Sequence, residues 1–328
     1  LCAKWQPRKG KIAAELAEKL GLSPKAYRKL LVGLTKVVES AMCAREWGSI
    51  NYSHVPSAAG TLYNAAFWRH DKDRYQEWKA ELAKPVAVDE KPKAKINVAT
   101  LYPHEVIKKI GTAYPYEEAW AKLQELFPEN DERILPVCDV SGSMHGLPMD
   151  VSVALGMFLS QRNRGPFQDC FMTFSERPVL QRLSGSLVQR MNQLQRAQWD
   201  MNTNLEAAMN AIAKAAEKAD PNDVPTMLLI LSDMQFDQCI KNADQNAFKM
   251  AKQIFKSKGL DLPKVVFWNL RDSGSNTLPV KAHKSGAALV SGYSPSILGG
   301  LLNSPKDFSP YGIMLRVLNA PRYEAITA

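Results

Sequence analysis

The sequence predicts an α/β domain, built on a doubly wound and mostly parallel sheet, that follows an α-helical module. From residue 134 onward, short apolar runs alternate with segments of helical spacing, which is typical of parallel strands joined by helices. The apolar runs are nearly continuous, as in residues 226–231, so both faces of the sheet are expected to be buried. Earlier in the chain, apolar residues recur at helical spacing. We therefore divide the chain into a basic helical module, residues 1–127, and an α/β domain, residues 128–328.

The helical module begins with an amphipathic stretch over residues 11–46. Ser23 is expected to cap a helix with Pro24 at its first position, because serine accepts an amide hydrogen bond there and proline fits the first turn. The polar loop 84–98 carries lysines and prolines, which fits a flexible linker and also fits a segment that contacts a polyanion. Further helices are predicted over 57–68, 71–83, 101–107 and 117–127.

The α/β domain is expected to contain five main strands and one short edge strand. The main strands are predicted over 134–140, 169–174, 226–232, 264–269 and 287–291, and the edge strand near 179–182. Helices are predicted over 148–161, 186–197, 203–219, 242–258 and 295–302, with a last helix within 309–328. An open α/β sheet binds ligands at the carboxyl ends of its strands, so residues that follow these strands are the candidates for a functional site.

The composition indicates a chain that buries a sizeable core and lacks a membrane anchor. It is 45% hydrophobic and 23% charged, which is ordinary for a globular protein. No apolar run approaches the roughly 18 residues that a membrane span needs, and no secretory signal is visible. The five cysteines are widely scattered, without the spacing of a disulfide framework or a zinc site. We therefore expect a reduced, cytoplasmic protein with no membrane partner.

The net charge of +9 lies wholly in the N-terminal third of the chain. Residues 1–115 hold 20 Lys and Arg against 11 Asp and Glu, and the rest of the chain is balanced. One-sided basic charge indicates a nucleic-acid or other acidic partner, and charge alone fits a solvated, lysine-rich surface about equally well. The candidate RNA-binding residues are Arg28, Lys29, Lys36, Arg45 and Arg69.

Aromatic residues lie among these basic residues and suit stacking on nucleotide bases. They are Tyr27, Trp47, Tyr52, Tyr63, Trp68 and Tyr75. Most of them sit at helical apolar spacing, so packing in the helical core is the favoured interpretation.

Oxygen-bearing side chains occur at three equivalent places in the α/β domain. Asp139, Ser141 and Ser143 follow the first predicted strand, Thr203 precedes a predicted helix, and Asp233 follows a later strand. Any one of these loops is explained by the preference of Asp, Ser and Thr for caps and turns. Together they supply two carboxylates and three hydroxyls on one edge of the sheet, which predicts a Mg²⁺ or Mn²⁺ site that keeps an open position.

A fourth loop, after the strand over 264–269, has two interpretations. Asn269, Arg271, Asp272 and Asn276 either extend a binding surface beside the metal, or Arg271 and Asp272 form an internal ion pair that shapes the loop. The second interpretation is favoured because a charge pair in a loop is ordinary.

The Asp-x-Ser-x-Ser triplet, the later Thr and the later Asp resemble the metal-ion-dependent adhesion site of von Willebrand factor A domains. The resemblance implies that Ser141, Ser143 and Thr203 are hydroxyl ligands and that Asp139 and Asp233 bind the metal directly or through water. It also implies that a carboxylate of a protein partner completes the coordination sphere. The third loop reads Ser-Asp-Met, where many such domains have Thr-Asp-Gly.

A wider resemblance covers most of the chain. The segments VCDVSGSM (137–144), VFWNLRD (266–272) and WGSINY (47–52) are similar to a family of plant and viral proteins. That family resembles in layout the Ro ribonucleoproteins (TROVE-like), which join a helical-repeat module that binds RNA in a basic ring to a von Willebrand factor A domain. The chain is short for this layout, so a full ring is not expected.

These observations predict a non-catalytic binding protein. The first hypothesis is Ro-like RNA binding by the helical module, with the metal holding an acidic group of a partner. The alternative is a metal-dependent adhesion or assembly module, such as a viral structural or scaffold protein, without RNA binding. An enzyme is not expected, because the five His show no paired metal-ligand spacing and neither a P-loop nor a GxGxxG motif occurs.

Overall fold

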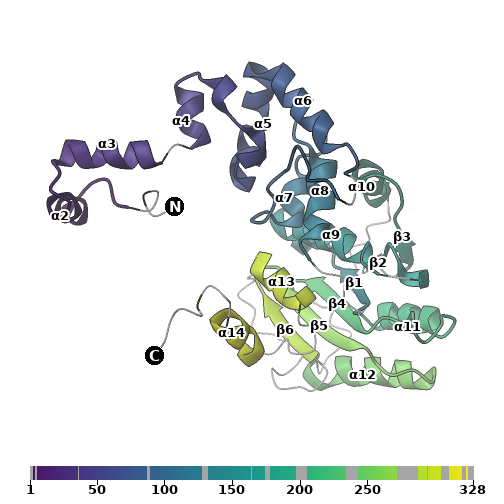
Figure 1. Ribbon diagram of the computed structural model, residues 1–328. Coiled ribbons are helices and arrows are strands. Elements are labelled where there is room, and N and C mark those ends of the chain that lie inside the picture. Colours follow the sequence, from purple (N-terminus) through teal and green to yellow (C-terminus); the bar gives the residue numbers. More distant parts are fainter. Residues whose placement is uncertain are drawn as a thin grey trace. The chain divides into compact units, whose positions relative to one another are not determined.

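The computed structural model divides the chain into two compact units (Figure 1). The first unit comprises Leu1–Asn97 with Thr112–Tyr114, and the second comprises Val98–Gly111 with Pro115–Ala328. The structure describes residues 3, 6–35, 37–86, 89–127, 132–163, 165–173, 178–196, 205–233, 243–271, 287–293, 295–303, 310–319 and 323. Within these residues, no helix is both long and apolar enough to cross a membrane.

The first unit is helical, as predicted. Its helices are α2 (Lys11–Lys19), α3 (Pro24–Leu34), α4 (Val38–Cys43), α5 (Ser57–His70) and α6 (Lys72–Leu82), with short 3-10 turns η1 (Trp47–Ser49) and η2 (Tyr52–His54). The Ser23 hydroxyl accepts a hydrogen bond from the Ala26 amide, which confirms the predicted cap. Helices α2 and α3 share a small core.

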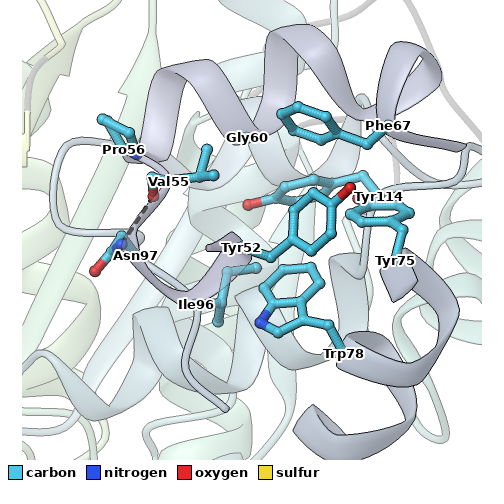
Figure 2. A pocket seen from close by; sticks show the side chains of 10 residues that line it. All are labelled: Tyr52, Val55, Pro56, Gly60, Phe67, Tyr75, Trp78, Ile96, Asn97 and Tyr114. Carbon is cyan, nitrogen blue, oxygen red and sulfur yellow. Dashed lines mark hydrogen bonds between the residues drawn. The ribbon is translucent and has the colours of Figure 1, made fainter. Parts of the chain in front are cut away.

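A second core in this unit is built from aromatic side chains. Tyr52, Phe67, Tyr75 and Trp78 pack around a cavity of about 10 Å³, which has room for a single water molecule (Figure 2). The Tyr52 hydroxyl donates to an Asp71 carboxylate oxygen at 2.7 Å, and burial together with that bond raises the pKa of Tyr52.

The core interpretation of the N-terminal aromatics is confirmed for Tyr27, Tyr52 and Tyr75, which are buried. Trp47, Tyr63 and Trp68 pack half-buried against the aromatic core. In the loop 84–98, the Asn97 amide donates to the carbonyls of Ser53 and Val55, so the end of the loop is fixed to this unit.

The second unit is an α/β fold around a six-stranded sheet. The strands are β1 (Ile134–Cys138), β2 (Cys170–Thr173), β3 (Leu180–Arg182), β4 (Met227–Ser232), β5 (Lys264–Asn269) and β6 (Ala287–Ser291). Their order is β3-β2-β1-β4-β5-β6, and only β3 is antiparallel to its neighbour among the described strands. This confirms the predicted mostly parallel sheet and its short edge strand.

Helices cover both faces of this sheet. The described helices are α7 (Pro103–Ile107), α8 (Tyr116–Glu125), α9 (Leu147–Ser160), α10 (Leu187–Arg196), α11 (Leu205–Ala216), α12 (Ala243–Ser257), α13 (Pro295–Asn303) and α14 (Pro310–Leu318), with 3-10 turns η3 (Gly142–Met144) and η4 (Gly165–Phe167). One face, which includes Val137, packs on α11 and α12. The next residue, Cys138, points to the opposite face and meets α9 at Gly156.

The division between the units falls earlier than the predicted boundary after residue 127. Helix α7 packs on α9, and Lys108 forms an ion pair with Asp150 at 2.8 Å. In α8, the Trp120 indole donates to Gln161 at 2.6 Å. These contacts with α9 place most of residues 98–127 with the sheet.

The close approach of α9 to β1 gives a stability prediction. A Cβ atom added at Gly156 would lie 2.4 Å from the Cys138 sulfur, so Gly156→Ala is expected to lower the free energy of unfolding by about 1–2 kcal/mol despite its better helix propensity. Gly33→Ala in α3 is the control, because its Cβ meets nothing within 4 Å and the change is expected to be neutral or stabilising. Urea unfolding of both variants measures the difference, and a Gly156→Ala protein as stable as the wild type would contradict the prediction.

Candidate metal centre

Two buried carboxylates lie at the carboxyl ends of neighbouring strands. Asp139 follows β1 and Asp233 follows β4, and both have 0% exposure. The two strands are parallel, with Cys138 opposite Leu231, and the Asp139 amide extends the ladder by donating to the Leu231 carbonyl at 2.8 Å. The sheet runs outward from β1 through β2 on one side and from β4 through β5 on the other, so these carboxylates lie where the strand order reverses. Ligands of doubly wound sheets bind at that position.

Hydrogen bonds fix the orientation of the Asp139 carboxylate. One oxygen accepts from the Ser141 amide at 2.9 Å, and the other accepts from the Ser232 hydroxyl at 2.6 Å. Burial raises the pKa of Asp139, the bonds from Ser232 and Ser141 oppose that rise, and the negative charge of Asp233 adds to it. The carboxylate is therefore ordered, but its charge is destabilised by its surroundings.

The loop after β1 brings two hydroxyls to the same place. The Oγ atoms of Ser141 and Ser143 lie 3.0 Å apart, and the turn η3, which contains Ser143, is anchored by the buried side chain of Met144. The structure thus brings Asp139, Ser141 and Ser143 together beside Asp233. Thr203, the fifth predicted ligand, lies outside the described residues.

This donor set fits a hard divalent cation. Carboxylate and hydroxyl oxygens are ligands that Mg²⁺ and Mn²⁺ accept, and a divalent charge would neutralise the two buried carboxylates. Among the described residues, no three His, Cys, Asp or Glu side chains gather as a metal site. The proposed site would therefore hold a cation through the two carboxylates of Asp139 and Asp233, with serine hydroxyls as additional ligands.

Two residues of this edge were not among the predicted ligands. Ser232 is fully buried and donates a hydrogen bond to Asp139. The only indication of this role in the sequence is that Ser232 directly precedes Asp233. Arg271 follows β5, and its guanidinium donates to the backbone carbonyl of Ser143. Asp272, the partner of Arg271 in the predicted ion pair, lies outside the described residues, as does Asn276.

The candidate RNA-binding residues belong to the first unit. Arg28 and Lys29 lie in α3, Arg45 follows α4 in a left-handed conformation, and Arg69 lies near the end of α5. All four are exposed, and none forms an ion pair within the part of the chain that the structure describes. Lys36 lies outside the described residues.

Comparison with known proteins assigns the α/β unit to a family. A domain of unknown function, DUF7788, matches residues 133–309, which is more than half of the chain. The chain belongs to the DUF7788 family. A second domain of unknown function, DUF2828, matches residues 15–135. The DUF7788 match begins at the first residue before β1 and contains every candidate metal ligand.

A viral protein is similar along nearly the whole chain. "Uncharacterized protein L728" of Acanthamoeba polyphaga mimivirus is 30% identical over 344 residues, which cover 97% of this chain and 60% of the viral protein. The chain therefore spans about 60% of the length of this relative. The likeness extends over both units.

The raised pKa of Asp139 gives a pH prediction for the metal-free protein. The folded state binds a proton at Asp139 more readily than the unfolded state, so this group lowers stability as pH rises from the ordinary Asp value through the raised folded value. Asp139→Asn is therefore expected to raise the free energy of unfolding at pH 7, and this advantage is expected to shrink as pH falls towards about 4, the ordinary pKa of an aspartate. Urea unfolding in EDTA across this pH range measures the effect.

The control for this prediction is Asp220→Asn. Asp220 also accepts an amide hydrogen bond from the residue two positions later, at 2.8 Å, but it is exposed. Its substitution is expected to leave stability nearly unchanged at each pH. A loss of stability in Asp139→Asn at pH 7 without metal would contradict the burial argument.

Proposed function

We propose that the α/β unit is a von Willebrand factor A-like domain that binds Mg²⁺ or Mn²⁺ and, through the metal, an acidic group of a protein partner. The observation that carries the proposal is the pair of buried carboxylates, Asp139 and Asp233, on neighbouring strands at the reversal of strand order. The hydroxyls of Ser141 and Ser143 would complete the protein's side of the site, with Thr203 added by the resemblance.

The bound metal would act as a hard Lewis acid that holds an oxygen of the partner. Asp139 and Asp233 would supply the negative charge, and the hydrogen bond from Ser232 would hold the Asp139 carboxylate in one orientation. Hydroxyl ligands are neutral and weak, so they would leave a coordination position that an oxygen of the partner's anion can take. We infer a binding protein rather than an enzyme, and a nuclease assay with Mn²⁺ tests that inference directly.

The metal proposal predicts a stability response to Mg²⁺. A ligand that binds only the folded state stabilises it by about 2.7 kcal/mol at a concentration 100 times the dissociation constant. We expect Mg²⁺ to raise the Tm of the wild type, and EDTA to reverse the rise. Asp233→Asn and Asp139→Asn are expected to abolish the response, because each removes one of the two buried charges. Differential scanning fluorimetry and isothermal titration measure the response and the affinity.

The matched control is again Asp220→Asn, which removes an exposed aspartate of the same unit and is expected to keep the full response. An equal Mg²⁺ response in wild type, Asp139→Asn and Asp233→Asn would place the metal elsewhere. No response in the wild type would exclude the site.

RNA binding by the first unit is the second candidate function. It is supported by the exposed basic residues Arg28, Lys29, Arg45 and Arg69 and by the net charge of +9, all of which lies in the N-terminal third. Because Tyr27, Tyr52 and Tyr75 are buried, the contacts would be to phosphates rather than by stacking on those rings. The Ro-like layout supports the same assignment.

The RNA proposal predicts salt-dependent binding. The double variant Arg28→Gln, Lys29→Gln is expected to bind a fluorescent single-stranded RNA more weakly and to reduce the slope of log affinity against log salt by about 1–2. Fluorescence anisotropy at about 50 and 200 mM salt, in EDTA, measures both quantities. Arg182→Gln in β3 is the control, because it removes one exposed cation from the other unit.

Absence of RNA binding would leave metal-dependent adhesion or assembly, including a viral structural or scaffold role, as the function. The free cysteines Cys43, Cys138 and Cys170 fit a reducing compartment, and we place the protein in the cytoplasm on that ground.

A further inference from the structure

Arg271 links two loops at the proposed metal centre. Its backbone amide donates to the Asn269 side chain at 3.0 Å, which turns the chain at the end of β5. Its guanidinium donates to the carbonyl of Ser143, a residue whose hydroxyl is a candidate metal ligand. The neighbouring Leu270 amide donates to the Ser232 carbonyl at 3.0 Å, so this loop is also fixed to β4. An exposed cation is thereby held against the loop that would carry the metal.

The guanidinium retains donors for an additional acceptor. An arginine side chain has five N–H donors in a planar fork. Among the described residues, the Arg271 side chain donates only to the backbone carbonyl of Ser143. A guanidinium fork matches the paired oxygens of a carboxylate, and hydrogen bonds between charged groups are stronger than neutral ones. Arg271 is therefore suited to bind an oxyanion that also reaches the metal.

The charges of the site select the kind of anion. Asp139 and Asp233 would balance a divalent cation, which leaves the single positive charge of Arg271 to be matched by a monoanion. A dianionic phosphate would overcompensate this charge. A nucleic-acid phosphodiester is also a monoanion, but it brings further negative charges to a unit with little surplus positive charge of its own, because the chain beyond residue 115 is electrically balanced. A single carboxylate needs only the local charge.

We propose that Arg271 is a specificity-determining residue that forms the second half of a two-point site for a carboxylate of an acidic protein segment. With the metal held by Asp139 and Asp233, one carboxylate oxygen would bind the metal and the other would accept hydrogen bonds from the Arg271 guanidinium. The inference rests on the proposed function, because it assigns the ligand of that same metal centre.

The test separates metal binding from anion binding. Electron paramagnetic resonance gives the Mn²⁺ affinity of the full chain, and water-proton relaxation of the Mn²⁺-loaded protein then reports acetate, which displaces metal-bound water. Arg271→Ala is expected to weaken acetate binding about tenfold and to leave Mn²⁺ affinity unchanged or slightly higher, since a nearby positive charge is removed. Arg271→Lys keeps the positive charge but loses the planar fork, so its acetate affinity is expected to lie between those of the wild type and Arg271→Ala.

Arg182→Ala is the matched control. Arg182 is also an exposed arginine whose guanidinium donates to a backbone carbonyl, that of Pro166, at the opposite edge of the sheet. This variant is expected to bind both Mn²⁺ and acetate as the wild type does.

Three results would overturn the inference. Equal acetate binding by wild type and Arg271→Ala would remove Arg271 from the anion site while leaving the metal centre intact. Loss of Mn²⁺ binding in Arg271→Ala would show that the residue positions the Ser143 loop instead of binding the anion. Tighter binding of dimethyl phosphate than of acetate would assign the site to a phosphodiester. Absence of Mn²⁺ binding by the wild type is a distinct result, which overturns the metal centre and this inference together.

Discussion

The parallel pairing of β1 with β4 is the constraint on which the candidate site depends. Because these strands end in register, the residues that follow them, Asp139 and Asp233, are buried near one another. Burying two like charges is unfavourable unless hydrogen bonds or a counter-charge compensate. The Ser232 hydroxyl and the Ser141 amide supply part of the compensation at Asp139, but burial still raises the pKa of this carboxyl. An arrangement of this kind is costly for folding alone, which is the physical reason for proposing that it binds a ligand.

The shape of the loop after β1 depends on packing some distance from the carboxylates. Helix α9 approaches β1 closely enough that only glycine fits at position 156, beside Cys138. The buried Met144 anchors the turn between the strand and this helix, so Ser141 and Ser143 are held by the core beneath them. A site on such a turn is preorganised, and a ligand would not need to order the loop when it binds.

The sequence predicted the elements of the sheet well, because continuous apolar runs between turn residues leave few alternatives. Strand β4, for example, lies within one residue of its predicted range. The role of Ser232 and the contact of Arg271 were not predictable in the same way. Each joins residues about a hundred positions apart, 93 for Ser232 with Asp139 and 128 for Arg271 with Ser143, and local spacing carries no information about such pairs.

The structural division between the units differs from the predicted boundary for a related reason. Residues 98–127 have helical apolar spacing. This spacing predicts that one face of each helix is buried, but it does not identify the element that covers that face. In the structure, α7 and α8 pack on α9, through contacts such as Trp120 with Gln161, and so belong with the sheet. The positions of the aromatic residues of the first unit were easier to predict, because their helical spacing already favoured the core. The structure buries Tyr52 and Tyr75 as that spacing predicts.

The two proposed binding surfaces obey different physical rules because they lie on different units. The exposed basic residues of the first unit interact through screened charges, so their contribution falls as ionic strength rises. The carboxylates of the α/β unit are fully buried, where salt screens weakly and the presence of a cation decides the local charge. If both proposals hold, salt and chelators would therefore act on separate surfaces of this chain. A partner that is released by a chelator but stays bound at high salt would bind at the carboxyl ends of β1 and β4. A partner that is released by high salt but not by a chelator would bind the basic helices.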